Sequence, residues 1–326
     1  MTADSHRCRG RADVLLSRVA DDIYWAARYL ERAEDTARVV RAHAETAADL
    51  PGRSAAHWKP LITVVGSEAQ YDERLGGDGS EAAVVEYLLS DQLNQGSVVH
   101  CVSAARDNLR TTRETIPTEG WQAINDLYHY VNVEADRGND RRARDRFTRH
   151  VVSDSRRIDG ILATTMSHDE AYAMWRLGRA LERADMTTRV LGVRAAAVLM
   201  GSGEGERGYD DLLWMGVLKS LSGLQMYRRA VPRPIEGPAV VRFLLEHDRF
   251  PRAVRALLRE IRRALGELPD PSAMFDEVDA VDAVVRASTS ADIDGAALDD
   301  AMETLQDALA QLDRRIHERY LRRNVA

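Results

Sequence analysis

The residues best suited to chemistry in this chain are arginines and glutamates that occur twice in the same short phrase. Residues 28–38 read RYLERAEDTAR and residues 179–189 read RALERADMTTR, with seven identities in eleven positions. Both copies fit the pattern R-x-L-E-R-A-[DE]-x-T-x-R. Arginine recognises carboxylate and phosphate groups through two parallel hydrogen bonds, so the phrase predicts either ion pairing or anion binding.

The phrase supplies the first set of candidate site residues. The candidate catalytic residues are Glu31 and Glu182, and the candidate ligand-binding residues are Arg28, Arg32, Arg179 and Arg183. A surface lattice of ion pairs is the simplest alternative, with Arg28 and Glu31 three residues apart on one helix. Each such pair contributes only about 0.2–0.5 kcal/mol, which is too little to require the same residue order twice. A partly buried polar cluster, serving as structural glue or as a binding site, is favoured instead.

A second polar set follows in the first half of the chain. Arg106, Arg110 and Arg113 are spaced i, i+4, i+7 and therefore share one face of a helix. A short turn at Pro117 leads to a second helix, and the two helices are expected to pack antiparallel. This packing would bring Asn125 toward the arginines and give them a tryptophan wall, as in an anion pocket. The alternative is a solvent-exposed arginine face.

One further candidate lies in the segment NQGS, which begins at Asn94. Signatures of familiar enzymes are missing from the sequence: it has no Walker A motif, no G-x-S-x-G, no H-E-x-x-H and no Rossmann glycine pattern. A di-iron helical bundle needs Glu-x-x-His on two helices, and no glutamate here has a histidine three residues later. Neither a metal nor a cofactor is therefore expected.

The repeat extends well beyond the phrase. A shift of 151 residues pairs Glu31 with Glu182, and a shift of 156 pairs Trp58 with Trp214 and Leu89 with Leu245. A glycine-rich segment at 201–209 accounts for the extra residues. Repetition at this distance predicts a duplicated unit of about 150 residues, the size of a domain. We therefore expect an N-terminal extension at 1–12, a first repeat at 13–165 and a second at 166–324, packed as one domain.

Composition restricts the class of protein. The chain has 326 residues, of which 44% are hydrophobic, and a net charge of −7, so nucleic acid is not an expected partner. It shows neither a signal peptide nor a run of about 18 apolar residues, so no membrane association and a cytoplasmic location are predicted. The two cysteines, Cys8 and Cys101, have no metal or redox spacing and are expected to be idle thiols.

Apolar residues recur at alternating spacings of three and four, and strand formers are sparse, which predicts an all-α multi-helix bundle with pseudo-twofold symmetry. An alanine-rich seam on the first long helix would let a partner helix approach closely. The core is expected to include Leu30, Leu181, Trp58, Trp214, Leu89 and Leu245. The expected helices cover residues 12–48, 57–73, 80–89, 95–116, 118–136, 142–165, 168–200, 209–229, 238–247, 250–267, 272–287 and 295–323.

Several segments together resemble the alpha-E family, also described as DUF403. These segments are LSRVADDIYWAARYLERAEDTARV, ARDNLRTTRETI with GWQAINDLY, LGRALERADMTTRVL, and VVRFLLEHDRFPRAV, and the resemblance covers roughly Leu15 to Tyr320. The family usually has N-P-S-S where this chain has Asn94-Gln95-Gly96-Ser97. The resemblance implies an all-helical protein encoded with, or fused to, a circularly permuted ATP-grasp ligase, in systems that often include a transglutaminase-like protein.

Three functions follow as alternatives from this resemblance and the residues. The first is a noncatalytic or cocatalytic partner of an ATP-grasp amidoligase that forms peptide or amide bonds. The second is an enzyme of the same pathway, with Glu31 or Glu182 as general acid or base. Adjacent arginines argue against the second, because a nearby cation lowers a carboxylate pKa, but they would suit an anionic acyl phosphate. The third is a purely structural scaffold.

Overall fold

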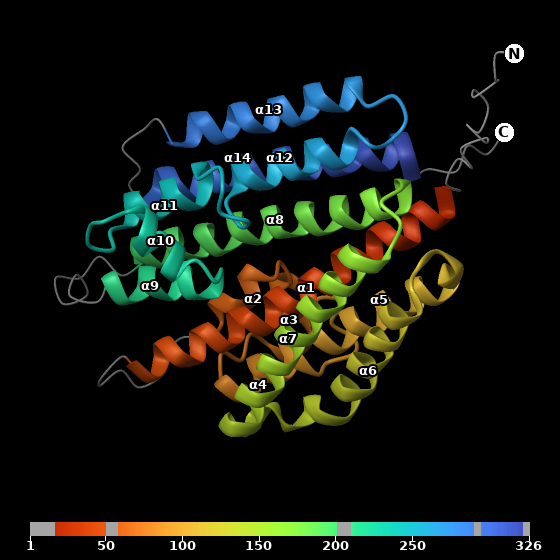
Figure 1. Ribbon diagram of the computed structural model, residues 1–326. Coiled ribbons are helices and arrows are strands. Elements are labelled where there is room, and N and C mark those ends of the chain that lie inside the picture. The colour runs from red at the N-terminus through yellow and green to blue at the C-terminus, as the bar shows by residue number, and fades with distance from the viewer. Residues whose placement is uncertain (1–16, 50–57, 201–209, 290–294, 322–326) are drawn as a thin grey trace, which may run out of the picture.

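A computed structural model describes residues 17–49, 58–200, 210–289 and 295–321 (Figure 1). Every regular element within these ranges is a helix, which confirms the all-α prediction. Among the described helices, none combines the length and the apolarity needed to cross a bilayer. The expected extension at 1–12, Cys8 and the glycine-rich segment at 201–209 lie outside the described residues.

Two long helices form the centre of the molecule. They are α1 (Ser17–Asp49) and α8 (Glu170–Met200), with 33 and 31 residues respectively. Each carries one copy of the repeated phrase, and the two helices pack directly against each other. Figure 1 shows them crossing between the earlier helices and the later ones. The phrase copies, about 150 residues apart in sequence, are therefore neighbours in space.

The helices between α1 and α8 cover one side of α1. α5 and α7 pack on α1, and α6 packs on both of them. The bounds of these elements are α2 (Pro60–Val64), α3 (Glu68–Leu75), α4 (Glu81–Leu89), α5 (Val98–Thr111), η1 (Arg113–Thr115), α6 (Thr118–Glu134), η2 (Ala135–Asn139) and α7 (Arg141–Thr165).

The helices after α8 build the opposite side. α12 and α14 pack on α8, and α13 lies outside them, as Figure 1 shows. The bounds are α9 (Asp210–Ser220), α10 (Leu224–Ala230), α11 (Gly237–Glu246), α12 (Val254–Leu265), α13 (Ser272–Thr289), α14 (Gly295–Ile316) and a π-helical turn, η4 (His317–Leu321). Helices from both predicted units thus share one core, while their division into two repeats stays a prediction.

The predicted core residues are buried without exception: Leu30, Leu181, Trp58, Trp214, Leu89 and Leu245 are each at most 7% exposed. The alanine seam of α1 is buried as well. Its helix presents Ala27, Ala33 and Ala37 to the interior with no exposed surface. Small side chains bring helix axes close together, so this seam explains how α1 fits within a ring of neighbouring helices.

Four predicted helices are divided or differ from the structure by more than two residues at an end; one of them, expected at 250–267, covers only Val254–Leu265. The expected helix 95–116 begins only at Val98, because the Ser97 hydroxyl caps it by accepting from the His100 amide, and it ends at Thr111. The expected helix 57–73 is divided at Gly66, whose φ of 70° breaks the helical path. The expected helix 209–229 is divided before α10, where Ser222 adopts a φ of 53°. These breaks depend on single residues and leave the apolar periodicity unchanged.

The two central helices approach each other closely at Gly178. A Cβ placed on Gly178 would lie 2.4 Å from the Tyr24 carbonyl oxygen and 3.1 Å from the Ala27 Cβ. The nearest atom belongs to a helix backbone, which cannot move aside as a flexible side chain would. The absence of a side chain at Gly178 therefore sets the spacing between α1 and α8.

We predict that Gly178→Ala lowers the free energy of unfolding by about 1–3 kcal/mol, the usual penalty for overpacking a core. Gly160 on α7 is the matched control, because a Cβ there meets no atom within 4 Å and the position is exposed. Gly160→Ala should be neutral or stabilising, by up to about 1 kcal/mol. Urea denaturation followed by circular dichroism measures both. Equal effects of the two substitutions would contradict the close crossing.

Candidate functional site

Each glutamate of the repeated phrase is bound by arginines of the opposite helix. Glu182 on α8 accepts a 2.8 Å hydrogen bond from Arg28 Nε. It also receives two hydrogen bonds from Arg32, of 2.6 Å from Nε and 3.0 Å from Nη2. The Glu182 side chain is only 2% exposed. A buried carboxylate thus faces two guanidinium groups that come from α1.

Glu31 on α1 is bound in the same way by arginines of α8. Glu31 on α1 accepts a 2.8 Å hydrogen bond from Arg179 Nε, and two hydrogen bonds from Arg183, of 2.8 Å from Nε and 2.7 Å from Nη2. Glu31 has no exposed surface. The first and fifth residues of one phrase therefore bind the fourth residue of the other, and the same happens in reverse. The six candidates from the phrase form one buried cluster at the helix crossing.

An aspartate extends the cluster at each end. Asp313 on α14 lies 2.8 Å from Arg28 Nη1 and accepts a 2.5 Å hydrogen bond from the Tyr24 hydroxyl. On the other side, Asp159 on α7 lies 2.5 Å from Arg179 Nη1 and accepts a hydrogen bond from the Trp175 indole at 3.1 Å. Arg28 is therefore held between two carboxylates, and Arg179 contacts three, because Glu34 also lies 3.2 Å from its Nη2 atom.

The two halves of the cluster differ in one respect. Around Glu31 the helix adds two more buried acids, Glu34 and Asp35, which are each 1% exposed or less. Arg252, just before α12, reaches all three: its guanidinium lies 3.0 Å from Glu31, 3.2 Å from Glu34 and 2.8 Å from Asp35. Arg38 pairs with Glu34 and Asp35 within α1. The side around Glu31 is thus a denser charge cluster than the side around Glu182.

The electrostatic environment keeps the two motif glutamates ionised. Burial alone would raise the pKa of Glu182, but Arg32 and Arg28 lower that pKa to about 2. Burial likewise opposes ionisation of Glu31, and Arg179, Arg183 and Arg252 hold its pKa well below the usual range. A general acid or base near neutral pH needs a pKa close to the working pH. These glutamates are therefore suited to ion pairing rather than to proton transfer.

Asp35 differs from them in its pKa. Burial raises the pKa of Asp35 to about 6, although Arg252 and Arg38 oppose the rise, and the nearby carboxylates of Glu31 and Glu34 add to it. Its Oδ1 atom receives both arginine contacts, whereas its Oδ2 atom is buried without a hydrogen-bond partner. Asp35 is therefore the one member of this acidic group whose burial outweighs its cations.

The second predicted set comes together only in part. Arg106 Nε donates to Asn125 Oδ1 at 2.7 Å, so α5 and α6 pack as expected and bring these two residues together. The Cζ atoms of Arg106 and Arg113 lie 5.6 Å and 5.5 Å from the centroid of the Trp121 ring, which gives the expected tryptophan wall. Arg110 does not join this group: its side chain is 64% exposed, and its closest ion-pair contact is with Asp107 at 3.9 Å.

Asn94 has a local role in its loop. Its Nδ2 atom donates to the Tyr87 carbonyl at 2.9 Å, and its Oδ1 atom accepts from the Gly96 amide at 2.9 Å. Both ends of this buried amide are thus used by the connection between α4 and α5, away from the Arg106 group. Within the described residues, no grouping of three or more His, Cys, Asp or Glu side chains is suited to a metal ion.

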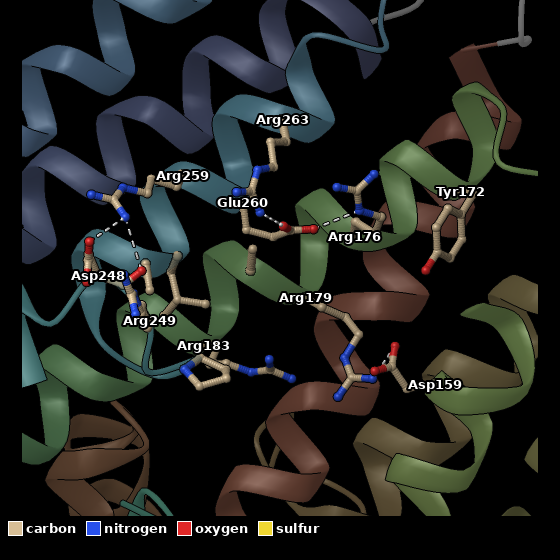
Figure 2. A pocket seen from close by; sticks show the side chains of 14 residues that line it. Asp159, Tyr172, Arg176, Arg179, Arg183, Asp248, Arg249, Arg259, Glu260 and Arg263 are labelled. Atoms are coloured by element: carbon tan, nitrogen blue, oxygen red, sulfur yellow. Dashed lines mark hydrogen bonds and ion pairs between the residues drawn. The ribbon is translucent and has the colours of Figure 1, made fainter. Parts of the chain in front are cut away.

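An open pocket of about 490 Å³ adjoins the buried cluster between α8 and α12 (Figure 2). Its lining includes six arginines against three acids, although the chain as a whole has a net charge of −7. Arg179 and Arg183 belong both to this lining and to the pairing with Glu31. The charged lining residues are Arg176, Arg179, Arg183, Arg249, Arg259, Arg263, Asp159, Asp248 and Glu260.

The Glu-Arg dipeptide of the repeated phrase matches the description of a known family. The alpha-E family, described as a predicted alpha-helical domain with a conserved ER motif, matches residues 15–321. The chain belongs to the alpha-E family. In this alpha-E chain the repeated phrase contains the Glu-Arg dipeptides Glu31-Arg32 and Glu182-Arg183, and each of these glutamates binds arginines of the other copy.

Curated relatives of this alpha-E chain are longer than the chain itself. Uncharacterized protein Mb2597 of Mycobacterium bovis and Uncharacterized protein Rv2567 of Mycobacterium tuberculosis are each 22% identical over 284 residues. The match covers 80% of the alpha-E chain and 31% of each relative, so the chain corresponds to about a third of their length. No solved structure matches it.

Sequence reasoning missed several members of the site in this alpha-E chain. Arg252 lies on a loop 221 residues after Glu31, and no local spacing connects the two. Its backbone is fixed by the phrase itself, because the Thr187 hydroxyl donates to the Arg252 carbonyl at 3.0 Å. Asp159 and Asp313 were also missed. The segment HDRFPRAV, which contributes to the family resemblance, carries Arg249 and Arg252 and was the available signal.

We predict that Glu182→Gln destabilises the alpha-E chain by about 3–5 kcal/mol at pH 7, because Arg28 and Arg32 lose a buried counter-charge. The folded pKa of about 2 lies below the ordinary value of 4.5, so the stabilisation is complete above pH 4.5 and is lost toward pH 2. The difference between wild type and variant should therefore shrink over this range in chemical denaturation. Exposed Glu303→Gln on α14 is the control and should change little. A constant difference from pH 5 to pH 2 would contradict this assignment.

Asp35→Asn should show the opposite pH dependence. Because the folded pKa of Asp35, about 6, exceeds its ordinary value of 3.8, the folded state binds more protons, and this group makes stability fall as pH rises through this interval. The amide cannot ionise, so the variant should gain stability relative to wild type between pH 4 and pH 7. The free energy of unfolding at several pH values measures this. A relative loss with rising pH would refute the burial argument.

Proposed function

We propose that this protein is a noncatalytic or cocatalytic partner of a circularly permuted ATP-grasp amidoligase, and that it holds an anionic intermediate of amide-bond formation. The observation that carries the proposal is the double role of Arg179 and Arg183, which fix Glu31 in the core and also line the arginine pocket. Guanidinium groups already held by a carboxylate are preorganised for a second anion, since their orientation costs no further entropy.

The protonation state of the cluster supports a binding role over acid–base catalysis. Both motif glutamates have lowered pKa values and are engaged by arginines on both carboxylate oxygens. Neither has a proton to give, and neither is among the residues that line the pocket. An anionic acyl phosphate or carboxylate would instead be stabilised by the arginine excess around it.

The length of the relatives is consistent with a partnership. The part that this chain matches is 31% of each mycobacterial protein, so the helical unit occurs there together with additional sequence in one chain. A helical unit that accompanies other sequence in some proteins suits a role beside an enzyme. On this proposal the ligase supplies ATP-dependent activation, and a transglutaminase-like protein is a further member of the system.

A structural scaffold is the second candidate, and one observation favours it. The buried charges are almost completely paired with one another, which is also what a role confined to fixing α1 against α8 would require. The two candidates differ in what they predict for the pocket. A scaffold needs no ligand there, whereas a partner that holds an intermediate does.

The proposal predicts that the purified protein alone releases no ADP from ATP and a peptide substrate, and that it stimulates its ATP-grasp ligase when the two are combined. Arg183→Lys keeps a positive charge but loses the paired geometry, so stimulation per folded molecule should fall by about ten- to a hundredfold. Arg110→Lys, at an exposed position outside the pocket, is the control. Turnover without the ligase would favour the enzyme, and unchanged stimulation by Arg183→Lys would favour the scaffold.

A further inference from the structure

The arginine pocket has cations on two separate walls. On α8, Arg176, Arg179 and Arg183 follow each other at spacings of three and four residues and therefore share one face. The opposite wall is formed by α12 and the loop before it, which contribute Arg249, Arg259 and Arg263. Figure 2 shows the two walls facing the same opening, with Arg183 and Arg179 at its base.

The acids of the pocket neutralise only some of these arginines. Arg176 is paired with Glu260 at 2.7 Å and with Glu267 at 2.8 Å, and Arg259 is paired with Asp248 at 3.0 Å. These two arginines are therefore already engaged. Their pairing leaves the positive charge of the pocket concentrated on the remaining guanidinium groups.

Three guanidinium groups retain capacity for a ligand. Arg249 is exposed, and within the described part of the chain no hydrogen bond or ion pair of its guanidinium is present. Arg263 is 72% exposed and approaches Glu260 only at 3.7 Å. Arg183 uses Nε and Nη2 for Glu31 and is 20% exposed, which leaves Nη1 for the pocket. Figure 2 shows these three residues at separate places around the opening.

The spacing of the cations indicates the kind of anion that fits. The three available cations come from separate segments around the pocket: Arg183 from α8, Arg249 from the loop before α12 and Arg263 from α12. Side chains on one face of an extended peptide repeat at about 7 Å, so two or three acidic residues can reach cations on separate segments. Between the charges, Ala180, Ala256 and Leu257 offer an apolar floor for the aliphatic parts of glutamate side chains.

We propose that the pocket between α8 and α12 binds an acidic peptide segment, whose carboxylates pair with Arg183 at the base and with Arg249 and Arg263 at the rim. The proposal rests on the proposed function, in that the segment would be the peptide substrate or product of the ligase. It also specifies that function, because it names the ligand as a peptide with several carboxylates rather than a nucleotide or free phosphate.

Fluorescence anisotropy with the full chain and fluorescein-labelled tetraglutamate tests this inference. Saturable binding is expected at fixed moderate salt, with tetraglutamine at least about tenfold weaker, because only the charged peptide makes charge-assisted hydrogen bonds. Inorganic phosphate and ATP serve as competitors and should displace the peptide poorly. Displacement by either one at lower concentration than unlabelled tetraglutamate would overturn the peptide assignment in favour of a phosphate ligand.

Variants locate the site. Arg249→Ala and Arg263→Ala should each weaken binding by about threefold, as for exposed ion pairs, and together by about tenfold. Both positions are exposed, so the melting temperature should remain near that of wild type. Arg286→Ala on α13 is the matched control, since Arg286 is 60% exposed and lies outside the pocket. Equal weakening by the control would identify nonspecific attraction and overturn the site.

The two proposals fail separately. Tetraglutamate binding needs only this chain, whereas stimulation of amide formation needs the ligase. Binding that depends on Arg249 and Arg263 without any stimulation would uphold the peptide site and remove the ligase partnership. Stimulation that survives Arg249→Ala combined with Arg263→Ala, with no detectable tetraglutamate binding, would remove the peptide site and leave the partnership.

Discussion

The exchange of arginines and glutamates between α1 and α8 is the interaction on which the rest of the structure depends. Burying these charges carries a large desolvation cost that only a matched partner offsets, so neither helix can keep its phrase inside the protein without the other. The exchange also fixes the register. A slip of one helical turn, about 5.4 Å, would separate every pair at once. The bare backbone at Gly178 allows the helices to come close enough for the arginines to reach across.

The predicted duplication gives two halves that agree in the core and differ at the surface. With the shift of 156 residues, Arg249 and Arg252 correspond to Leu93 and Gly96. The equivalent surface of the first half therefore lacks the rim arginine and the arginine that holds three carboxylates. It carries instead Trp25 and Tyr29, whose rings lie 5.6 Å apart, and Leu93 with 70% exposure. On the predicted duplication, all six arginines of the pocket come from the second half, and the first half contributes Asp159 to the lining.

Sequence reasoning was reliable where a single helix or a short connection decided the outcome. The burial of Leu30 and Leu181 follows from periodicity, and the Arg106–Asn125 contact follows from the short turn at Pro117. Within α1 and α8, the pairs Glu34–Arg38 and Asp185–Arg189 have the four-residue spacing that favours ion pairs on a helix, and both form.

Spacing failed where a residue had equally good partners nearby and far away. Arg28 has Glu31 three positions later in the sequence, yet it binds Glu182 and Asp313. These two acids are distant in sequence, but the helix crossing places them next to Arg28 in the interior. Arg252 could not have been placed from local pattern, since its partners on α1 are brought to it only by the packing of the entire second half. The pocket has the same origin, because its walls belong to helices separated by more than fifty residues.

The loop before α12 has a mechanical consequence. Arg249 stands at the rim of the pocket, and only three residues later Arg252 is paired with Glu31, Glu34 and Asp35 in the core. Three residues of backbone thus join a solvent-facing cation to the most densely charged point of the interior. If the rim moved far enough to break hydrogen bonds, Arg252 would be pulled away from three carboxylates. These carboxylates would then repel one another without a compensating cation. The rim of the pocket is therefore held in place, because its movement would leave the buried carboxylates of Glu31, Glu34 and Asp35 without Arg252.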